Sequence, residues 1–317
     1  MLPQASRPES DPQVPAPSGP ALRPGAAKLM RRATIFSVSV AIGLTVVKLF
    51  AWLATGSVAM LSSLVDSILD AFASITTMLA LAHALTPADQ EHRFGHGKAE
   101  PLASVGQAAF IAGSASFVLI EAARRLWQPV PIGASVLGIG VMVLAILVTL
   151  ALLAYQRHVV RQTGSLAISG DSLHYAGDVL TNLAVILSLV LGGVFGIDLA
   201  DPLLGAAIAV YLLYGSWTLA RRALAMLMDE ELPEVERARI RAISLAEPEV
   251  KAIHDLRTRA SGPHRFIQFH LELDGGMKLV DAHAVADRVE AALRREFPDS
   301  EVIIHQDPAG LEVVAGA

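Results

Sequence analysis

Six stretches of mostly apolar residues dominate this 317-residue chain. Hydrophobic residues make up 53% of it and charged residues only 17%, a composition typical of a membrane protein with a soluble part attached. A helix needs about 20 apolar residues to cross the hydrocarbon layer of a bilayer. The sequence therefore predicts a polytopic α-helical membrane protein with six transmembrane helices. Their expected limits are residues 33–54, 59–83, 102–126, 133–155, 168–192 and 200–226.

Two of these stretches carry ionisable side chains near their middles. Asp66 and Asp70 lie four residues apart in the second, and His174 and Asp178 lie four residues apart in the fifth. An i,i+4 pair shares one face of a helix, so two facing helices can supply three carboxylates and one imidazole. Because ionisable groups are costly at this depth, the pattern indicates a four-ligand site for a divalent metal inside the membrane.

The distribution of basic residues predicts the orientation of the helices. Most of them fall on one side of the membrane, which places both termini in the cytoplasm and makes the second and fifth helices antiparallel. Arg124 and Arg125, at the end of the third helix, break the pattern. The basic residues that agree with this orientation are Arg31, Arg32, Arg93, Lys98, Arg157, Arg161, Arg221 and Arg222.

Three carboxylates close together in a membrane repel one another unless a dication or protons neutralise them. Metal and protons would then compete for the same atoms, which is the physical basis of exchange transport. Lys48 is the basic candidate within the spans, and a local ion pair or snorkelling explains it better than a ligand role. Asp171 and Asn182 have two readings, as residues of an access path or as partners in capping and interhelical hydrogen bonds.

Two further clusters of candidate ligands lie outside the predicted spans. Asp89, His92 and His96 have a spacing that suits one metal site on a loop, although loops often carry solvated histidines. The second cluster, suited to one or two zinc-type sites, comprises His254, His270, His283, His305 and Asp307. His305 and Asp307 share one face of a predicted strand. His264 is a sixth candidate, and the other reading of it is a simply exposed histidine.

From about residue 230 the pattern becomes that of a small soluble domain. Pro233 can begin a helix that runs to about Leu245, and residues 250–259 predict a strand. Apolar and polar residues alternate over 266–273, residues 280–297 predict an amphipathic helix, and 301–306 a last strand. The expected order is αββαβ, an α+β domain of roughly 80 residues, which is marginal in stability without a metal or a second copy.

The predicted divisions are a disordered Pro-rich tail over 1–27, a transmembrane domain over 28–228, a cytoplasmic metal-binding and dimerisation domain over 229–311, and a second disordered tail over 312–317. Composition also excludes some functions. The chain has no cysteine, so thiolate metal sites and disulfides are excluded, and its net charge of -5 argues against nucleic-acid binding.

The chain resembles the cation diffusion facilitator family, in particular its bacterial YiiP/FieF-like branch of zinc and iron efflux transporters. The resemblance covers nearly everything after the N-terminal tail. It is carried by TGSVAMLSSLVDSILD, HRFGHGKAEPLA, LHYAGDVLTN, HDLRTRASGPHRFIQFHLEL, AHAVAD and VIIHQDP.

The resemblance implies metal efflux driven by proton counterflow in a homodimer with a metallochaperone-like cytoplasmic domain. It implies a transport site of Asp66, Asp70, His174 and Asp178, and a loop site of Asp89, His92 and His96. It further implies a binuclear cytoplasmic site of His254, His270, His283, His305 and Asp307, bridged by Asp307. Lys98 and Asp229 match a pair that joins the membrane and soluble domains.

The leading hypothesis is a Zn²⁺/H⁺ antiporter of the bacterial inner membrane rather than an enzyme. The histidine ligand disfavours Mg²⁺, whereas Fe²⁺, Co²⁺, Ni²⁺ and Cd²⁺ stay open as substrates. An intramembrane metalloenzyme is the alternative from another class, but a catalytic zinc usually keeps an open coordination position. A metal sensor whose membrane part is only an anchor is a third hypothesis.

Overall fold

The computed structural model describes residues 25–128, 136–195, 197 and 199–310. The two predicted tails fall almost wholly outside these residues, except that the first helix already begins at Ala26. Six long helices confirm the predicted transmembrane domain. They are α1 (Ala26–Thr55), α2 (Val58–Ala84), α3 (Ala99–Trp127), α4 (Val136–Thr163), α5 (Leu166–Phe195) and α6 (Ala200–Leu227).

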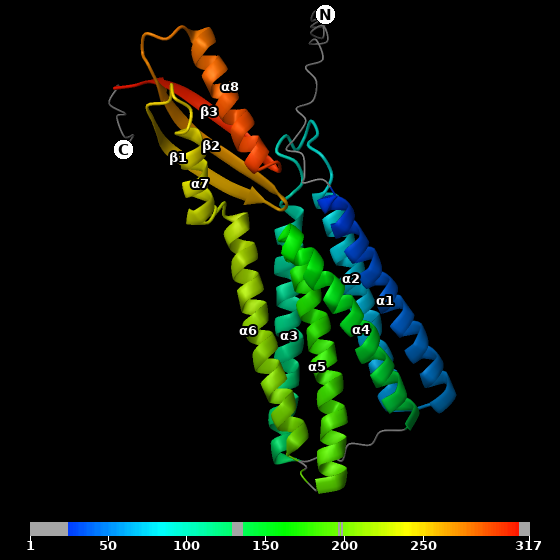
Figure 1. The fold of residues 1–317 in the computed structure, drawn as a ribbon. Helices are drawn as coiled ribbons and strands as arrows, with labels where there is room; N and C mark the ends of the chain where they lie inside the picture. Colours follow the sequence, from blue (N-terminus) through cyan, green and yellow to red (C-terminus); the bar gives the residue numbers. More distant parts are fainter. Residues whose placement is uncertain (1–24, 129–135, 196, 198, 311–317) are drawn as a thin grey trace, which may run out of the picture.

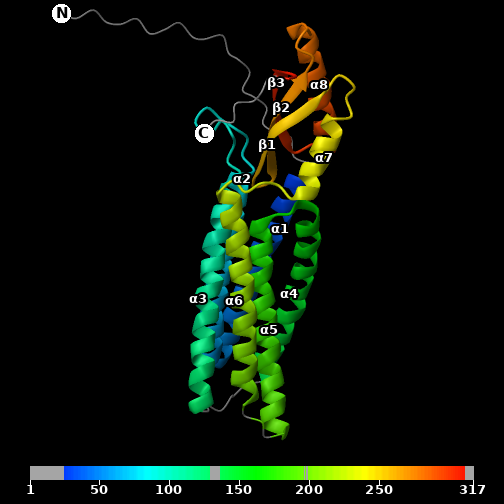
Figure 2. The same cartoon turned by 90° about the vertical axis from the view of Figure 1, so that its left-hand side faces the viewer.

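The six helices form a bundle with a soluble domain at one end (Figure 1). Helix α3 packs along α6, α1 packs against α2 and α4, and α5 lies between these two groups (Figures 1 and 2). Since α2 runs toward the soluble domain and α5 runs away from it, the two helices are antiparallel, as predicted. The beginning of α1 and the end of α6 lie at the same end of the bundle as the soluble domain.

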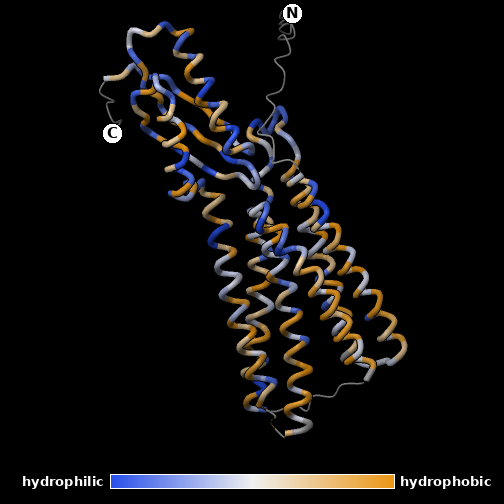
Figure 3. The backbone as a smooth tube through the Cα atoms, viewed as in Figure 1, coloured by the Kyte–Doolittle hydropathy of each residue, from blue (hydrophilic) through white to orange (hydrophobic). Residues whose placement is uncertain are grey.

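Hydrophobic residues predominate along the helices of the bundle (Figure 3). All six helices are long and apolar enough to cross a membrane, and only 17% to 33% of the most apolar part of each is buried within the chain. Large side chains such as Phe72, Phe117 and Trp217 are therefore exposed. This surface requires lipid or a second copy of the chain to cover it.

Arg124 and Arg125, which break the pattern of basic residues, have partners in the structure. Arg125 contacts Asp201 at 2.9 Å and Glu121 at 3.0 Å, and Arg124 lies 3.6 Å from Glu121. Because Asp201 lies in the first turn of α6, the first of these contacts joins α3 to α6 at the end of the bundle far from the soluble domain. The two arginines are thus neutralised locally.

The soluble domain has the predicted αββαβ order. Its elements are α7 (Glu234–Ser244), β1 (Ala252–Ser261), β2 (His264–Leu273), α8 (Leu279–Glu296) and β3 (Ser300–Pro308). Strand β2 is central, antiparallel to β1 and parallel to β3. Ile267, Phe269 and Leu271 of β2 are buried in one core with residues of α7 and α8, so Gln268 and His270 lie on the opposite face, as the alternation predicts.

The soluble domain meets the bundle where the β1–β2 turn packs on the loop between α2 and α3. A Cβ atom on Gly97 would lie 2.1 Å from the carbonyl oxygen of Ser261, so only glycine permits this approach. Phe94 of the loop packs edge-on against Phe266 at 5.8 Å between ring centroids. The guanidinium of Arg259 covers both rings, at 5.3 and 4.2 Å. The loop is therefore held against the soluble domain.

Candidate metal centres

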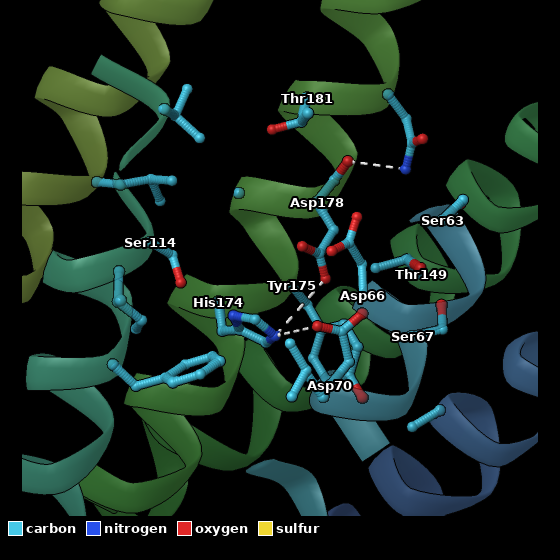
Figure 4. A pocket seen from close by; sticks show the side chains of 18 of the residues that line it. Ser63, Asp66, Ser67, Asp70, Ser114, Thr149, His174, Tyr175, Asp178 and Thr181 are labelled. Carbon is cyan, nitrogen blue, oxygen red and sulfur yellow. Dashed lines mark hydrogen bonds and ion pairs between the residues drawn. The ribbon is translucent and has the colours of Figure 1, made fainter. Parts of the chain in front are cut away.

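A cavity of about 620 Å³ opens inside the bundle, and its wall contains the four predicted transport ligands. Asp66 and Asp70 come from α2, and His174 and Asp178 from α5 (Figure 4). Asp66 and His174 are the ninth residues of their helices, and Asp70 and Asp178 the thirteenth, in helices of 27 and 30 residues. Antiparallel packing of the two helices therefore brings the two pairs to a similar depth.

Three of the four predicted ligands form a compact set. His174 Nε2 lies 2.9 Å from Asp70 Oδ1 and 3.9 Å from Asp178 Oδ2. One ligand atom from each of these residues lies within 4.8 Å of the others, a separation suited to binding one cation. Asp66 lies beside Asp178 in the same cavity but outside this set (Figure 4). Three carboxylates and one imidazole therefore line the same cavity.

Lys48 also lines the cavity, where its ammonium donates a hydrogen bond to Ser67 Oγ at 2.6 Å. Ser67 belongs to α2, so this contact ties α1 to the helix that carries Asp66 and Asp70. The contact agrees with a local role for Lys48 rather than a ligand role.

Asp171 joins four helices through hydrogen bonds. Its Oδ2 accepts from Ser37 of α1 at 2.5 Å and from Gln156 of α4 at 2.7 Å, and its Oδ1 accepts from Ser74 of α2 at 3.3 Å. The side chain is buried, and His174 lies one turn further along α5. Of the two readings of Asp171, the interhelical hydrogen bonds are what the structure contains.

Asn182 has a more local partner. Its amide donates to the backbone carbonyl of Asp178, one turn earlier in α5, at 2.9 Å. The side chain nevertheless lines the cavity. Its bonding therefore stays within its own helix, unlike that of Asp171.

The loop between α2 and α3 brings Asp89, His92 and His96 together. Each offers a ligand atom within 4.8 Å of the others. The backbone N–H of His92, donating to Asp89 Oδ1 at 2.6 Å, holds the pKa of the Asp89 carboxyl below its ordinary value. The side chain of His96 is only 5% exposed, and its Nδ1 has no hydrogen-bond partner among the described residues. A buried, unpaired ring nitrogen beside an ionised carboxylate fits a bound cation.

A third cluster lies on the outer face of the sheet. Asp307 Oδ2 accepts from His270 Nδ1 at 2.7 Å and lies 3.4 Å from His254 Nε2, while its Oδ1 lies 3.1 Å from His305 Nε2. The hydrogen bond from His270 lowers the pKa of Asp307. The two carboxylate oxygens thus face different histidines, an arrangement that suits a ligand shared by two ions.

His283 does not join this cluster within one chain. It lies on α8, which packs on the core face of the sheet, whereas His270 is on the other face. Its side chain is 68% exposed, and its Nε2 lies 3.6 Å from Asp287 Oδ2 on the same helix. The sequence could not indicate that His283 lies apart from the cluster, because the spacing of residues does not reveal which face of a sheet a helix covers.

Glu272 is a polar partner that the sequence reasoning missed. Its Oε1 lies 3.0 Å from His254 Nδ1, on the side of the ring opposite the nitrogen that faces Asp307. A carboxylate in this position fixes the tautomer and orientation of a metal-binding histidine. The signal was available, since Glu272 follows His270 at i+2 on the polar face of the same strand.

Lys98 and Asp229 lie at the junction between the two domains. Lys98 Nζ is 3.0 Å from Asp229 Oδ1 and donates to the carbonyl oxygen of Leu227 at 3.3 Å. Arg259 of β1 contacts the same carboxylate at 3.3 Å. Burial opposes ionisation of Asp229, but the hydrogen bond from Lys98 and the charge of Arg259 outweigh it, so its pKa lies below the ordinary value.

Comparison with known proteins identifies both parts of the chain. Residues 34–228 match the family model described as cation efflux transmembrane domain, and residues 232–309 match that of cation efflux protein, cytoplasmic domain. Two relatives named cation-efflux pump FieF, from Klebsiella pneumoniae subsp. pneumoniae and Salmonella arizonae, are each 46% identical over 284 residues. Each alignment covers 90% of this chain and 94% of the relative.

A solved structure, the metal-bound C-terminal domain of a CzcD transporter from Thermotoga maritima, is 29% identical in sequence. It aligns with 26% of this chain and 100% of its own length, with a TM-score of 0.24.

Proposed function

Because this chain belongs to the cation efflux family, the cation diffusion facilitators, and is a multi-pass membrane protein that exports divalent metal, we propose that its substrate is Zn²⁺ and that protons are the counter-ion. In the proposed cycle, cytoplasmic Zn²⁺ enters the cavity, α2 and α5 move against the other helices, and protons from the far side displace the metal. The protein would work in the bacterial inner membrane with both termini in the cytoplasm.

One observation carries this proposal: carboxylates and an imidazole from antiparallel helices converge in one membrane cavity. Asp70, His174 and Asp178 already lie within reach of one ion, and Asp66 is beside them. When the cation leaves, the carboxylates repel one another in surroundings of low dielectric, and protons relieve that repulsion. The same atoms therefore hold either the metal or the protons.

The donor set favours Zn²⁺ among the divalent ions. Zinc accepts imidazole and carboxylate ligands in a four-coordinate site, which is what one histidine and three aspartates supply. Mg²⁺ prefers octahedral oxygen ligands and keeps its waters. Fe²⁺, Co²⁺, Ni²⁺ and Cd²⁺ share enough of this ligand chemistry to be tested beside zinc.

The clusters outside the membrane would have different tasks. The residues of the sheet face fit resident zinc ions, because Asp307 presents separate oxygens to His270 and His305. In addition, the buried Nε2 of His254 has no hydrogen-bond partner within the part of the chain that the structure describes. Bound metal there would favour closure of a homodimer, and so regulate export. The loop residues Asp89, His92 and His96 would form a separate site.

The alternative of an intramembrane metalloenzyme has less support. A catalytic zinc usually has three protein ligands and one open position for water, whereas a fourth carboxylate lies in this cavity. The two hypotheses differ in their readout: an enzyme would turn over a peptide or lipid without moving metal.

The test uses purified protein in proteoliposomes with Zn²⁺ on one side and an imposed pH gradient. We expect Zn²⁺ flux that increases with the opposing proton gradient, and we expect Asp70→Ala to abolish it. Glu121→Ala is the matched control, because Glu121 is an acid of the bundle that is not among the residues lining the cavity and that pairs with Arg124 and Arg125. A Zn²⁺ flux that does not depend on the proton gradient would refute antiport. A wild-type flux in Asp70→Ala would refute the proposed transport site. Running Fe²⁺, Co²⁺, Ni²⁺ and Cd²⁺ in parallel ranks the substrates.

A further inference from the structure

His83 lies beside the loop cluster although it belongs to none of the sequence motifs. It occupies the last turn of α2, and its ring centroid is 4.6 Å from that of His96, at an angle of 63°. On another side of His96 the ring of His92 lies at 4.5 Å. His96 is therefore in contact with two other imidazoles, and its Nε2 is 3.4 Å from Asp89 Oδ2.

The polar atoms of this cluster do not fulfil one another's hydrogen-bonding capacity. His96 is almost wholly buried, yet its Nδ1 has no hydrogen-bond partner among the described residues. Asp89 uses Oδ1 for the backbone N–H groups of Glu91 and His92, which leaves Oδ2 turned toward His96. An unpaired ring nitrogen and a carboxylate oxygen that face the same imidazoles suit a bound cation.

We propose that His83 is a fourth protein ligand of the loop site, which it converts into a closed tetrahedral Zn²⁺ site with Asp89, His92 and His96. This inference rests on the proposed loop site and extends it. Three protein ligands leave a position for water, whereas structural zinc sites are closed by four. Two imidazole nitrogens on one tetrahedral zinc are about 3.3 Å apart, which rings already in contact reach by small rotations.

The accessibility of the residues agrees with this assignment. His83 is exposed at the helix end, and the side chains of Asp89 and His92 are about half exposed. An ion can therefore enter from solvent, and these three side chains can turn toward the buried ring of His96.

A closed site would connect α2 with the soluble domain. His83 lies thirteen residues after Asp70 on α2, while the loop is packed on β2 through Phe94 and Phe266. Ligation by His83 therefore ties the end of the helix that carries two transport ligands to a loop that the soluble domain holds. With only Asp89, His92 and His96 as ligands, the metal would stay within the loop and make no such connection.

The experiment isolates the loop site in the full-length protein. Asp70→Ala and Asp307→Ala remove ligands of the other two sites, and the probe is Co²⁺ alone, followed by visible absorption and equilibrium binding. Four-coordinate Co²⁺ absorbs visible light far more strongly than five- or six-coordinate Co²⁺. Into this background we introduce His83→Ala, His83→Gln and, as matched control, His158→Ala, an exposed histidine of α4 that contacts Gln162.

We expect intense bands in the background protein and in His158→Ala. In both His83 variants we expect weak bands and an affinity at least about tenfold lower, since even outer-shell partners of a metal cost 10- to 100-fold when removed. The role of His83 would be refuted if both His83 variants kept the same bands and affinity while Asp89→Ala lost the Co²⁺ ion bound at the loop site. The loop site itself would then still be supported. If Asp89→Ala also keeps this Co²⁺ ion, both the loop site and its fourth ligand are wrong.

Discussion

Lys98 and Asp229 meet at 3.0 Å across the boundary between the membrane bundle and the soluble domain. Lys98 lies just before α3, and Asp229 follows α6 in a left-handed backbone conformation with φ 57°. The lysine also donates to the carbonyl of Leu227, where a cation is favourable because it faces the carboxyl end of a helix. This pair therefore holds the end of α6 against the beginning of α3.

We expect Lys98→Glu to loosen this junction without unfolding either domain. The pair is about 40% exposed, so its loss costs at most about 1 kcal/mol, but the new carboxylate would also repel Asp229. Hydrogen exchange of the backbone amides of residues 228–232 measures the effect, and it should become faster. Adding Asp229→Asn removes the repulsion and retains a residue that tolerates positive φ, so it should slow the exchange again. An unchanged exchange rate in Lys98→Glu would show that the pair does not hold the junction.

Removing Asp171 should destabilise the bundle. Interhelical hydrogen bonds in membrane proteins contribute about 0.6 kcal/mol each on average, so losing the three from Ser37, Ser74 and Gln156 should cost about 2 kcal/mol. Asp171→Asn should cost less, because one amide oxygen still accepts. Thermal unfolding in detergent measures the difference, with Asn182→Ala as the control, since its hydrogen bond stays within α5. Equal thermal stability of Asp171→Ala and the control would contradict this account.

Much of the fold follows from the sequence because its physical cause is local. Length and apolarity fix the number of membrane helices, and alternation fixes the core face of β2. The largest error in a helix limit is at α4, which continues to Thr163 instead of residue 155. The added turns contain Arg157 and Arg161, which end a hydrophobic stretch but not a helix.

The same distinction between local and non-local causes applies to the candidate sites. The pairs in α2 and α5 could be predicted, because i,i+4 spacing places two side chains on one helical face. His83 could not, since nothing near it in sequence indicates that its ring lies against His96. Asp66 and His283 illustrate the same limit: the sequence names them as ligands, whereas the distances that separate them from the other ligands depend on packing.

His264 should make the stability of the soluble domain sensitive to acid. Burial, only partly offset by the negative charge of Asp299, lowers the pKa of His264, and its Nδ1 has no hydrogen-bond partner among the described residues. A histidine whose pKa is lower in the folded state binds more protons when unfolded. Stability should therefore be complete above about pH 7 and fall as the pH drops below the unfolded value of about 6.5.

Chemical denaturation of the metal-free protein at pH 7.5 and pH 5.5 measures this effect. We expect His264→Gln to lose less stability between the two pH values than the unaltered protein, because glutamine does not titrate. A chelator removes bound metal beforehand, because acid would otherwise release metal from the other histidines of the domain and change the stability by that route. An identical loss in both proteins would assign the acid sensitivity to groups other than His264.

His305 should matter more for regulation than for transport itself. It lies on the outer sheet face, where its Nε2 is 3.1 Å from Asp307 Oδ1, far from the cavity between α2 and α5. We expect His305→Ala to weaken zinc-dependent closure of the dimer, measured as a zinc-induced change in distance between labels on the two soluble domains. The chain has no cysteine, so one engineered cysteine on each copy reports this distance without background. Zn²⁺ flux at saturating zinc should change by less than the closure does, because Asp70, His174 and Asp178 are untouched. A parallel loss of closure and saturated flux would contradict the separation of regulatory and transport sites.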